Sequence, residues 1–270
     1  MSPVEPHPLA KLALPLIGML HAPPLPGSPR YAGSWEAVCN SVLRDADTLA
    51  SAGFPALLLE NFGDAPFFAD SVPAATIAHL AALAEQVRRA VDLPLGINVL
   101  RNDGSAAIAI AAASGACFVR INILCGAALT DQGIITGRAA EVLRLRAQLG
   151  ASRSIRILAD AAVKHAAPLA ARPLAEEIGD LTERGLADGI IISGSRTGAA
   201  TDAQRVAEAK GAARDIPIYV GSGVDAANAP GLLRFANGLI VGTALKDEGD
   251  VSRPVCLDRA KAIVAAVRGN

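Results

Sequence analysis

Short apolar runs alternate with longer helical patterns along almost the whole chain. Within the runs, apolar and polar residues do not strictly alternate, which is typical of strands buried on both faces of a parallel sheet. We predict strands at residues 14–20, 56–60, 95–99, 118–122, 155–159, 189–192, 218–220 and 239–241. Helices are predicted after each of them, at residues 34–52, 73–91, 103–114, 137–149, 173–184, 202–213, 226–235 and 259–267.

This alternation predicts an α/β protein built as a single (β/α)8 TIM barrel. We expect one domain over residues 1–270, with residues 1–12 as a short N-terminal extension. An open, doubly wound sheet is the alternative fold. It is disfavoured because eight units would make the sheet unusually wide, and because no GxGxxG motif follows the first strand.

The positions of glycines and of irregular segments also support the barrel. Glycines that follow helical patterns are predicted to end the helices in the left-handed conformation: Gly53, Gly115, Gly150 and Gly185. The longest segments without a regular pattern are residues 21–33, 61–72, 123–136 and 161–172. All follow predicted strands, so we expect them to gather at the end of the barrel where active sites of barrel enzymes lie.

The composition narrows the function classes. The chain has 25 basic and 26 acidic residues and only 3% aromatic residues, so a nucleic-acid partner is not expected. The four cysteines form no CxxC pair, and they are typical of reduced thiols in a cytoplasmic protein. No long apolar stretch is uninterrupted, so no transmembrane segment is expected. The composition is compatible with a homo-oligomer.

Polar residues follow several of the apolar runs. A barrel would bring them together around one mouth, where burial requires ligand contacts or mutual hydrogen bonds. They are His21, Glu60, Asn61, Asn98, Arg101, Asn102, Arg120, Asn122, Asp160, Lys164 and His165.

Several of these residues have a structural alternative. Arg120 is equally consistent with substrate binding and with a salt bridge to Glu60 or Asp160 across the barrel. Asn61 and Asn102, each taken alone, are typical of turn residues that bind local backbone. Asp160 ends a buried strand, which favours a catalytic or metal-binding role.

Metal binding is left open. An oxygen and nitrogen site for a divalent metal would draw on His21, Glu60, Asp160 and His165. Their spacing matches no standard metal motif, so neither the metal nor any other cofactor is identified.

Glycine turns after the last two predicted strands indicate an anion site. Glycine lets the backbone approach a ligand closely, and such turns present N–H groups. In (β/α)8 barrels the loops after strands seven and eight commonly hold phosphate. The expected phosphate-binding residues are Ser193, Gly194, Gly221, Ser222, Gly223, Gly242 and Thr243.

Several strings of the sequence together resemble the BtpA/SgcQ family of barrel proteins. The strings start at Pro24 (PLPGSP), Glu60 (ENFGDAPF), Gly96 (GINVLRND), Phe118 (FVRIN), Thr130 (TDQG), Ala159 (AD, then VKH), Ser193 (SG, then TG) and Gly221 (GSG). The resemblance implies a barrel of the ribulose-phosphate-binding type. It implies little about the reaction, since the family takes its name from a photosystem I factor although other members occur without photosynthesis.

Two functions are therefore expected. The first is an enzyme of carbohydrate metabolism that isomerises, epimerises or cleaves a small phosphorylated sugar or nucleoside. Its catalytic candidates are Asp160, Glu60, Lys164 and His21, and its substrate-binding candidates are Asn61, Asn98, Arg101, Asn102, Arg120, Asn122 and His165. The alternative is a non-catalytic biogenesis or assembly factor that keeps a metabolite pocket.

Overall fold

Eight parallel strands close into a barrel, as the sequence predicts. The computed structural model describes residues 6–12, 16–161, 163, 165–170, 172–194 and 201–269. The barrel strands are β1 (Leu16–His21), β2 (Ala56–Glu60), β3 (Leu95–Asn98), β4 (Phe118–Ile121), β7 (Arg156–Ala161), β9 (Gly189–Ile192), β10 (Ile218–Val220) and β11 (Gly238–Val241). They pair in the order β1-β11-β10-β9-β7-β4-β3-β2, so the first and last barrel strands lie side by side. The doubly wound alternative is thereby excluded.

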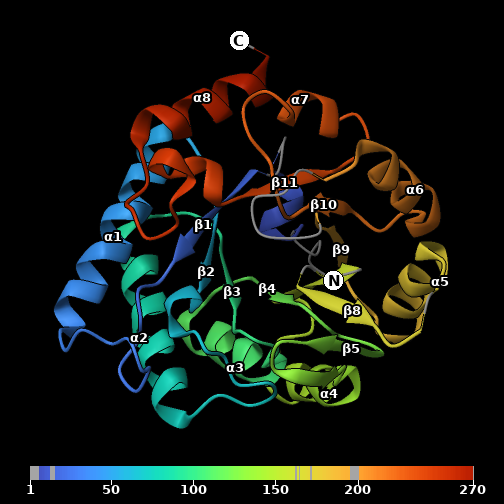
Figure 1. The fold of residues 1–270 in the computed structure, drawn as a ribbon, viewed down its shortest axis with the longest axis horizontal. Helices are drawn as coiled ribbons and strands as arrows, with labels where there is room; N and C mark the ends of the chain where they lie inside the picture. The colour runs from blue at the N-terminus through green and yellow to red at the C-terminus, as the bar shows by residue number, and fades with distance from the viewer. Residues whose placement is uncertain are drawn as a thin grey trace, which may run out of the picture.

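Helices surround the barrel on its outer side (Figure 1). They are α1 (Trp35–Ala52), α2 (Ala74–Ala90), α3 (Gly104–Ser114), α4 (Ala139–Gln148), α5 (Leu174–Gly179), α6 (Ala203–Ala213), α7 (Ala229–Leu232) and α8 (Leu257–Arg268). A π-helical turn, η3 (Asp180–Arg184), continues α5. α7 is much shorter than the helix expected over residues 226–235, because Asp225 and Asn228 bind local backbone there as turn residues do.

The predicted helix stops are correct at three glycines and wrong at one. Gly150 follows α4 and its cap residue Leu149 with a left-handed φ of 67°. Gly53 and Gly115 end α1 and α3 with left-handed φ angles of 91° and 74°. Gly185 has a φ of −83°, and the next residue, Leu186, takes the left-handed conformation instead. A Cβ at position 185 would lie 2.6 Å from the sulfur of Cys125, so close packing favours glycine there.

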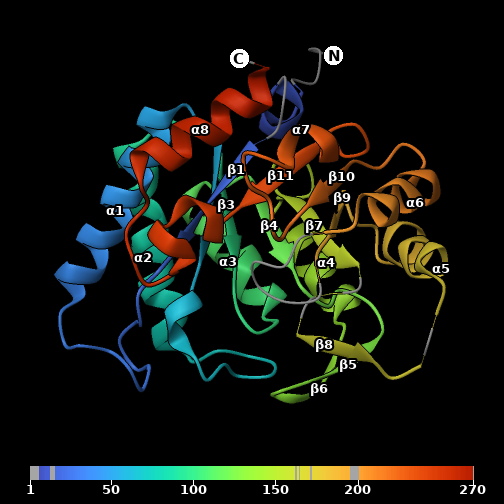
Figure 2. The same cartoon turned by 45° about the horizontal axis from the view of Figure 1, so that its top comes forward.

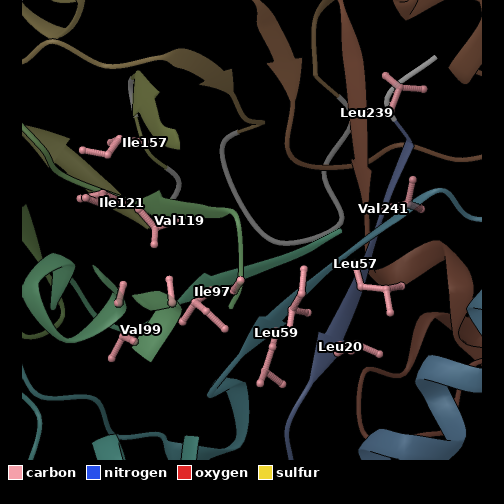
Figure 3. Close-up of a cluster of buried hydrophobic side chains, with 14 of the residues drawn as sticks. Leu20, Leu57, Leu59, Ile97, Val99, Val119, Ile121, Ile157, Leu239 and Val241 are labelled. Atoms are coloured by element: carbon pink, nitrogen blue, oxygen red, sulfur yellow. The ribbon is translucent and has the colours of Figure 1, made fainter. Parts of the chain in front are cut away.

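Two apolar layers stabilise the barrel. Outward-facing residues of the strands pack against the helices, and Figure 3 shows Leu57, Leu59 and Ile97 among them. Inward-facing residues fill the barrel interior, among them Ile17 and Leu158. Because both faces of each strand are buried, the strands need apolar residues at almost every position, which explains the runs in the sequence.

The amino-terminal end of the barrel is closed by the short 3-10 helix η1 (Pro8–Lys11). Its Leu9 is 6% exposed and packs in the same cluster as the barrel interior. The ring of His7 contacts the carbonyl of Cys117 at 2.9 Å, which fixes this segment to the barrel.

A small antiparallel sheet lies at the opposite end of the barrel. It consists of β5 (Ala127–Thr130), β6 (Gly133–Thr136) and β8 (Ala166–Pro168), in the order β6-β5-β8. Figure 2 shows it on the far side of the molecule from η1. The expectation of irregular structure at residues 123–136 and 161–172 is therefore wrong, because segments of two separate loops pair with each other.

Short 3-10 helices follow two of the barrel strands. They are η2 (Phe62–Asp64) after β2, and η4 (Thr243–Leu245) and η5 (Asp247–Gly249) after β11. Among the described residues, no helix combines the length and apolar character needed to span a bilayer.

Candidate functional site

Each barrel strand contributes one residue, at or directly after its carboxyl end, to the uppermost layer of the barrel interior. Side chains of a strand face the same side at every second position. On β1, for example, Ile17 and Met19 lie in the interior cluster, and the next inward position is His21. The same step on all eight strands gives His21, Glu60, Asn98, Arg120, Asp160, Ser193, Gly221 and Gly242. The topology thus brings together residues far apart in the sequence, and all eight were predicted candidates.

The two glycines of this layer open a cavity of about 220 Å³, called here the first cavity. Its lining includes both glycine turns, at residues 221–223 and 242–243, and also Glu60 and Arg120. A Cβ at position 242 would lie 3.0 Å from Cε1 of His21, and one at position 221 would lie 2.5 Å from a methyl group of Ile191. Glycine therefore keeps both the cavity and the barrel wall free of overlap.

Neighbouring side chains fix the turn after β10. Thr201 donates to the carbonyl of Ser222 at 3.0 Å, and Asn228 donates to the carbonyl of Gly223 at 2.7 Å. Gly223 has a left-handed φ of 64°. These bonds hold the turn in place.

Arg120 and Asp160 form a bidentate ion pair beside the first cavity. Arg120 donates through Nε to Oδ2 of Asp160 at 2.9 Å and through Nη2 to Oδ1 at 2.7 Å. Asn122 donates to Oδ2 at 3.0 Å and Ser193 to Oδ1 at 3.1 Å. Each carboxylate oxygen thus accepts two hydrogen bonds. The predicted salt bridge of Arg120 therefore exists, with Asp160 as its partner.

The ion pair keeps Arg120 charged in spite of its burial. The side chains of Arg120 and Asp160 are 2% and 0% exposed. Burial by itself lowers the pKa of Arg120, but the negative charges of Asp160 and Glu60 outweigh that effect and raise the pKa above its usual value. Arg120 thus presents a fixed positive charge to the first cavity.

Glu60 and His21 lie together on the other wall of the first cavity. They pair in register across β1 and β2, and Nε2 of His21 lies 3.9 Å from Oε1 of Glu60. The ring of Phe62, which follows on η2, lies 4.7 Å from the ring of His21, measured between centroids. A carboxylate and an imidazole at this separation are suited to moving a proton at a ligand between them.

Asn98 and Asn122 connect the ion pair to β3. Asn98 donates to the carbonyl of Arg120 at 3.0 Å and to Oδ1 of Asn122 at 3.3 Å. The side-chain oxygen of Asn98 is buried and has no hydrogen-bond partner among the residues that the structure describes. It is therefore a candidate acceptor for a hydroxyl group.

Other predicted substrate-binding residues hold the loops of the mouth. Asn61 accepts from the backbone N–H of Leu100 at 2.7 Å, and Asn102 binds both backbone groups of Ile123 at 2.8 and 2.9 Å. Arg101 is 5% exposed. Burial lowers its pKa, and the nearby negative charges of Asp160 and other acidic residues oppose that shift.

Of the predicted residues that remain, those that the structure describes do not line the first cavity. Ser193 and Gly194 line a different cavity, described below, although the hydroxyl of Ser193 also lies beside Gly221 of the first glycine turn. His165 is exposed, and its φ is 55°. Lys164 lies outside the described residues. Among the described residues, no group of three or more His, Cys, Asp or Glu side chains is arranged to hold a metal ion.

Phe62 and Arg259 are two of the lining residues of the first cavity that the sequence did not predict. Phe62 lies within the ENFGDAPF string but was assigned no role. Arg259, in the first turn of α8, also lines the first cavity and lies 3.6 Å from Asp247. The signal for Arg259 was its place on the helix that follows the last glycine turn, since barrel phosphate sites commonly include such a helix end.

Comparisons with known proteins agree with the architecture. The chain is 47% identical over 252 residues to an uncharacterized protein of Thermococcus kodakarensis, covering 93% of this chain and 94% of that protein. It is 42% identical to the photosystem I biogenesis protein BtpA of Synechocystis, covering 94% and 88%. Orotidine 5′-phosphate decarboxylase of Pyrococcus horikoshii shares the fold, with a TM-score of 0.58, 13% identity and coverage of 94% and 100%.

Family membership follows from the length of chain that matches the family as well as from the sequence identity to relatives. Residues 13–269 match the BtpA family, a range that includes every residue of the uppermost barrel layer. The chain therefore belongs to the BtpA family.

Proposed function

We propose that this protein is an enzyme that moves a proton on a small phosphorylated metabolite, as an isomerase, epimerase or lyase does. The observation that carries the proposal is the content of the first cavity. There, two glycine turns suited to binding phosphate line the same cavity as a carboxylate, an imidazole and a guanidinium. Phosphate binding and proton transfer need these groups within one small volume.

The phosphate group is assigned to the turns at residues 221–223 and 242–243. Arg259 borders the same cavity and adds a positive charge at its rim. The shared fold of orotidine 5′-phosphate decarboxylase, an enzyme named for a phosphorylated compound, supports this assignment by analogy.

Proton transfer is assigned to Glu60 and His21. The Glu60 carboxylate removes a proton from a carbon next to a carbonyl, and the electron pair moves onto the carbonyl oxygen, where Arg120 stabilises the charge. Return of the proton to the neighbouring carbon gives an isomer. In the cleavage reaction the proton is instead removed from a hydroxyl on the β-carbon, the bond between the α- and β-carbons breaks, and its electron pair moves onto the carbonyl oxygen as an enolate that is then protonated at the α-carbon. His21 delivers or accepts the proton of the oxygen.

Asp160, the other predicted acid or base, is assigned to positioning. Its two oxygens already accept four hydrogen bonds, so it is not set to exchange protons with a substrate. Its contribution is to orient Arg120 toward the first cavity.

The phosphate site is tested with Gly242→Val. A side chain at position 242 would enter the first cavity, with its Cβ 3.0 Å from Cε1 of His21. We expect calorimetric affinity for ribose 5-phosphate and inorganic phosphate to fall about tenfold or more while the melting temperature changes little. Gly211→Val on α6 is the matched control, since a Cβ there meets no atom within 4 Å. Equal affinities in both variants would place any phosphate elsewhere.

The chemistry is tested by hydrogen exchange in D2O. We expect the protein to exchange the proton next to the carbonyl of a bound sugar phosphate for deuterium. The exchange is measured as the loss of the NMR signal of that proton. Glu60→Gln should slow this exchange by about 100-fold or more without loss of phosphate binding. If a broad panel of phosphorylated sugars shows binding but no exchange, the non-catalytic assembly role suggested by the name of the Synechocystis relative is favoured instead.

A further inference from the structure

A second cavity at the barrel mouth takes no part in the proposed phosphate site. It has a volume of about 560 Å³ and is lined by residues from the ends of β4, β7 and β9, from the small sheet, and from α5 and α6. Its walls are largely apolar and include Ile123, Val163, Leu174 and Leu181. Cavities of roughly 300–1,000 Å³ with such walls and a few polar groups are typical of sites for small organic molecules.

The two cavities meet at the ion pair. Arg120 lines the first cavity, whereas Asp160 and Ser193 line the second. Nη2 of Arg120 lies 2.7 Å from Asp160 and 3.5 Å from the hydroxyl of Ser193. A Cβ at Gly221, in the wall of the first cavity, would lie 3.1 Å from that hydroxyl. A molecule held at the first cavity therefore needs to extend past only one layer of side chains to reach the second.

The polar groups of the second cavity fall into two sets. Asn122, Asp160 and Ser193 are buried where β4, β7 and β9 end, whereas Glu177 and the exposed Arg172 and Arg205 lie on or next to α5 and α6. Apolar walls together with these polar groups suit a flat heterocycle, which has apolar faces and hydrogen-bonding edges. An unbranched alkyl chain would leave these polar groups unmatched.

We propose that the substrate is a sugar phosphate that carries a ring, such as a nucleobase, and that the ring binds in the second cavity. This inference rests on the proposed function, because the first cavity must hold the phosphate. The reacting centre of the substrate then lies between the cavities, next to Arg120 and within reach of Glu60.

The small sheet supplies a matched pair of variants. Ala166 of β8 lines the second cavity, whereas the next residue, Ala167, is exposed and is not part of the lining. Successive side chains of a strand point to opposite faces, so a phenylalanine at position 166 enters the cavity and one at position 167 does not. Neither residue belongs to the first cavity.

Isothermal titration calorimetry with ribose 5-phosphate and a panel of nucleoside 5′-monophosphates tests the inference. We expect at least one nucleotide to bind about tenfold or more tightly than ribose 5-phosphate. Ala166→Phe should abolish that gain and leave the affinity for ribose 5-phosphate unchanged, and Ala167→Phe should preserve both. Should Ala166→Phe not fold, Leu169→Asp at the exposed rim of the cavity is expected to have the same selective effect.

The outcomes separate this inference from the proposed function. If ribose 5-phosphate binds and no nucleotide binds more tightly, the ring site is refuted while the phosphate site stands. If Ala166→Phe weakens both ligands equally, the ring does not occupy the second cavity. If neither ribose 5-phosphate nor inorganic phosphate binds, the proposed function itself fails.

Discussion

Replacing Asp160 by asparagine tests how the barrel mouth is held together. The substitution keeps the size of the side chain and removes its charge, while Arg120 keeps its positive charge because a guanidinium stays protonated in proteins. Each carboxylate oxygen accepts two hydrogen bonds. The NH2 group of asparagine takes the place of one of these oxygens. The two hydrogen-bond donors that contacted that oxygen then face another donor instead of an acceptor.

The expected loss of stability is large. Removing one partner of a buried ion pair typically costs about 3–5 kcal/mol, since a charge is left buried and unpaired. A change of 1 kcal/mol shifts the melting temperature of a protein of about this size by roughly 2–4 °C. We therefore expect Asp160→Asn to lower the melting temperature by roughly 6–20 °C.

Thermal unfolding followed by far-UV circular dichroism measures the effect. Glu85→Gln is the matched control, because it makes the same chemical change in an exposed pair with Arg89 on α2. Exposed pairs contribute about 0–1 kcal/mol, so the control should melt close to the unsubstituted protein. An Asp160→Asn variant that melts with the control would refute the assignment of Asp160 to holding Arg120.

Further predictions concern two other buried groups. Lys246 lies 2.6 Å from Asp45 with its side chain 2% exposed, directly after η4, so Lys246→Met should cost about 3–5 kcal/mol in thermal or urea unfolding and weaken phosphate binding. An unchanged melting temperature would contradict this. Burial raises the pKa of Cys117 to about 11, so the thiol stays protonated at pH 8.5. Its alkylation by iodoacetamide, followed by mass spectrometry, should be roughly tenfold or more slower than that of glutathione and should accelerate up to about pH 11; a rate equal to that of glutathione would contradict the raised pKa.

The barrel could be predicted from the sequence because each strand carries its own local signal. Strands buried on both faces need apolar residues at nearly every position, and a polar residue such as Glu60 or Asp160 then marks the end of the strand. The inward repeat of two residues places those polar side chains in one layer. The residues that share this layer could therefore be predicted as a set.

The contacts within the set could not be predicted in this way. Whether Arg120 pairs with Glu60 or with Asp160 depends on which side chains meet across the barrel, and no local pattern reports that. The small sheet was missed because its strands are three or four residues long and come from two loops. Leu129 and Ile134 of this sheet are apolar but exposed, so its strands lack the apolar and polar pattern of a strand with one buried face. Arg259 was missed because a helical arginine at a cavity and one at the surface look alike in sequence.

The pairing of β1 with β11 has a consequence for synthesis of the protein. β1 leaves the ribosome long before its partner strand, and Asp45 precedes Lys246, its buried partner, by 201 residues. At roughly 5–20 residues per second, translation of that interval takes roughly 10–40 s. During this time the unpaired edge of β1 is open to incorrect pairing with other chains. The nascent chain therefore depends on protection of that edge until β11 emerges, and a translational pause between the two strands would prolong the period in which it can aggregate.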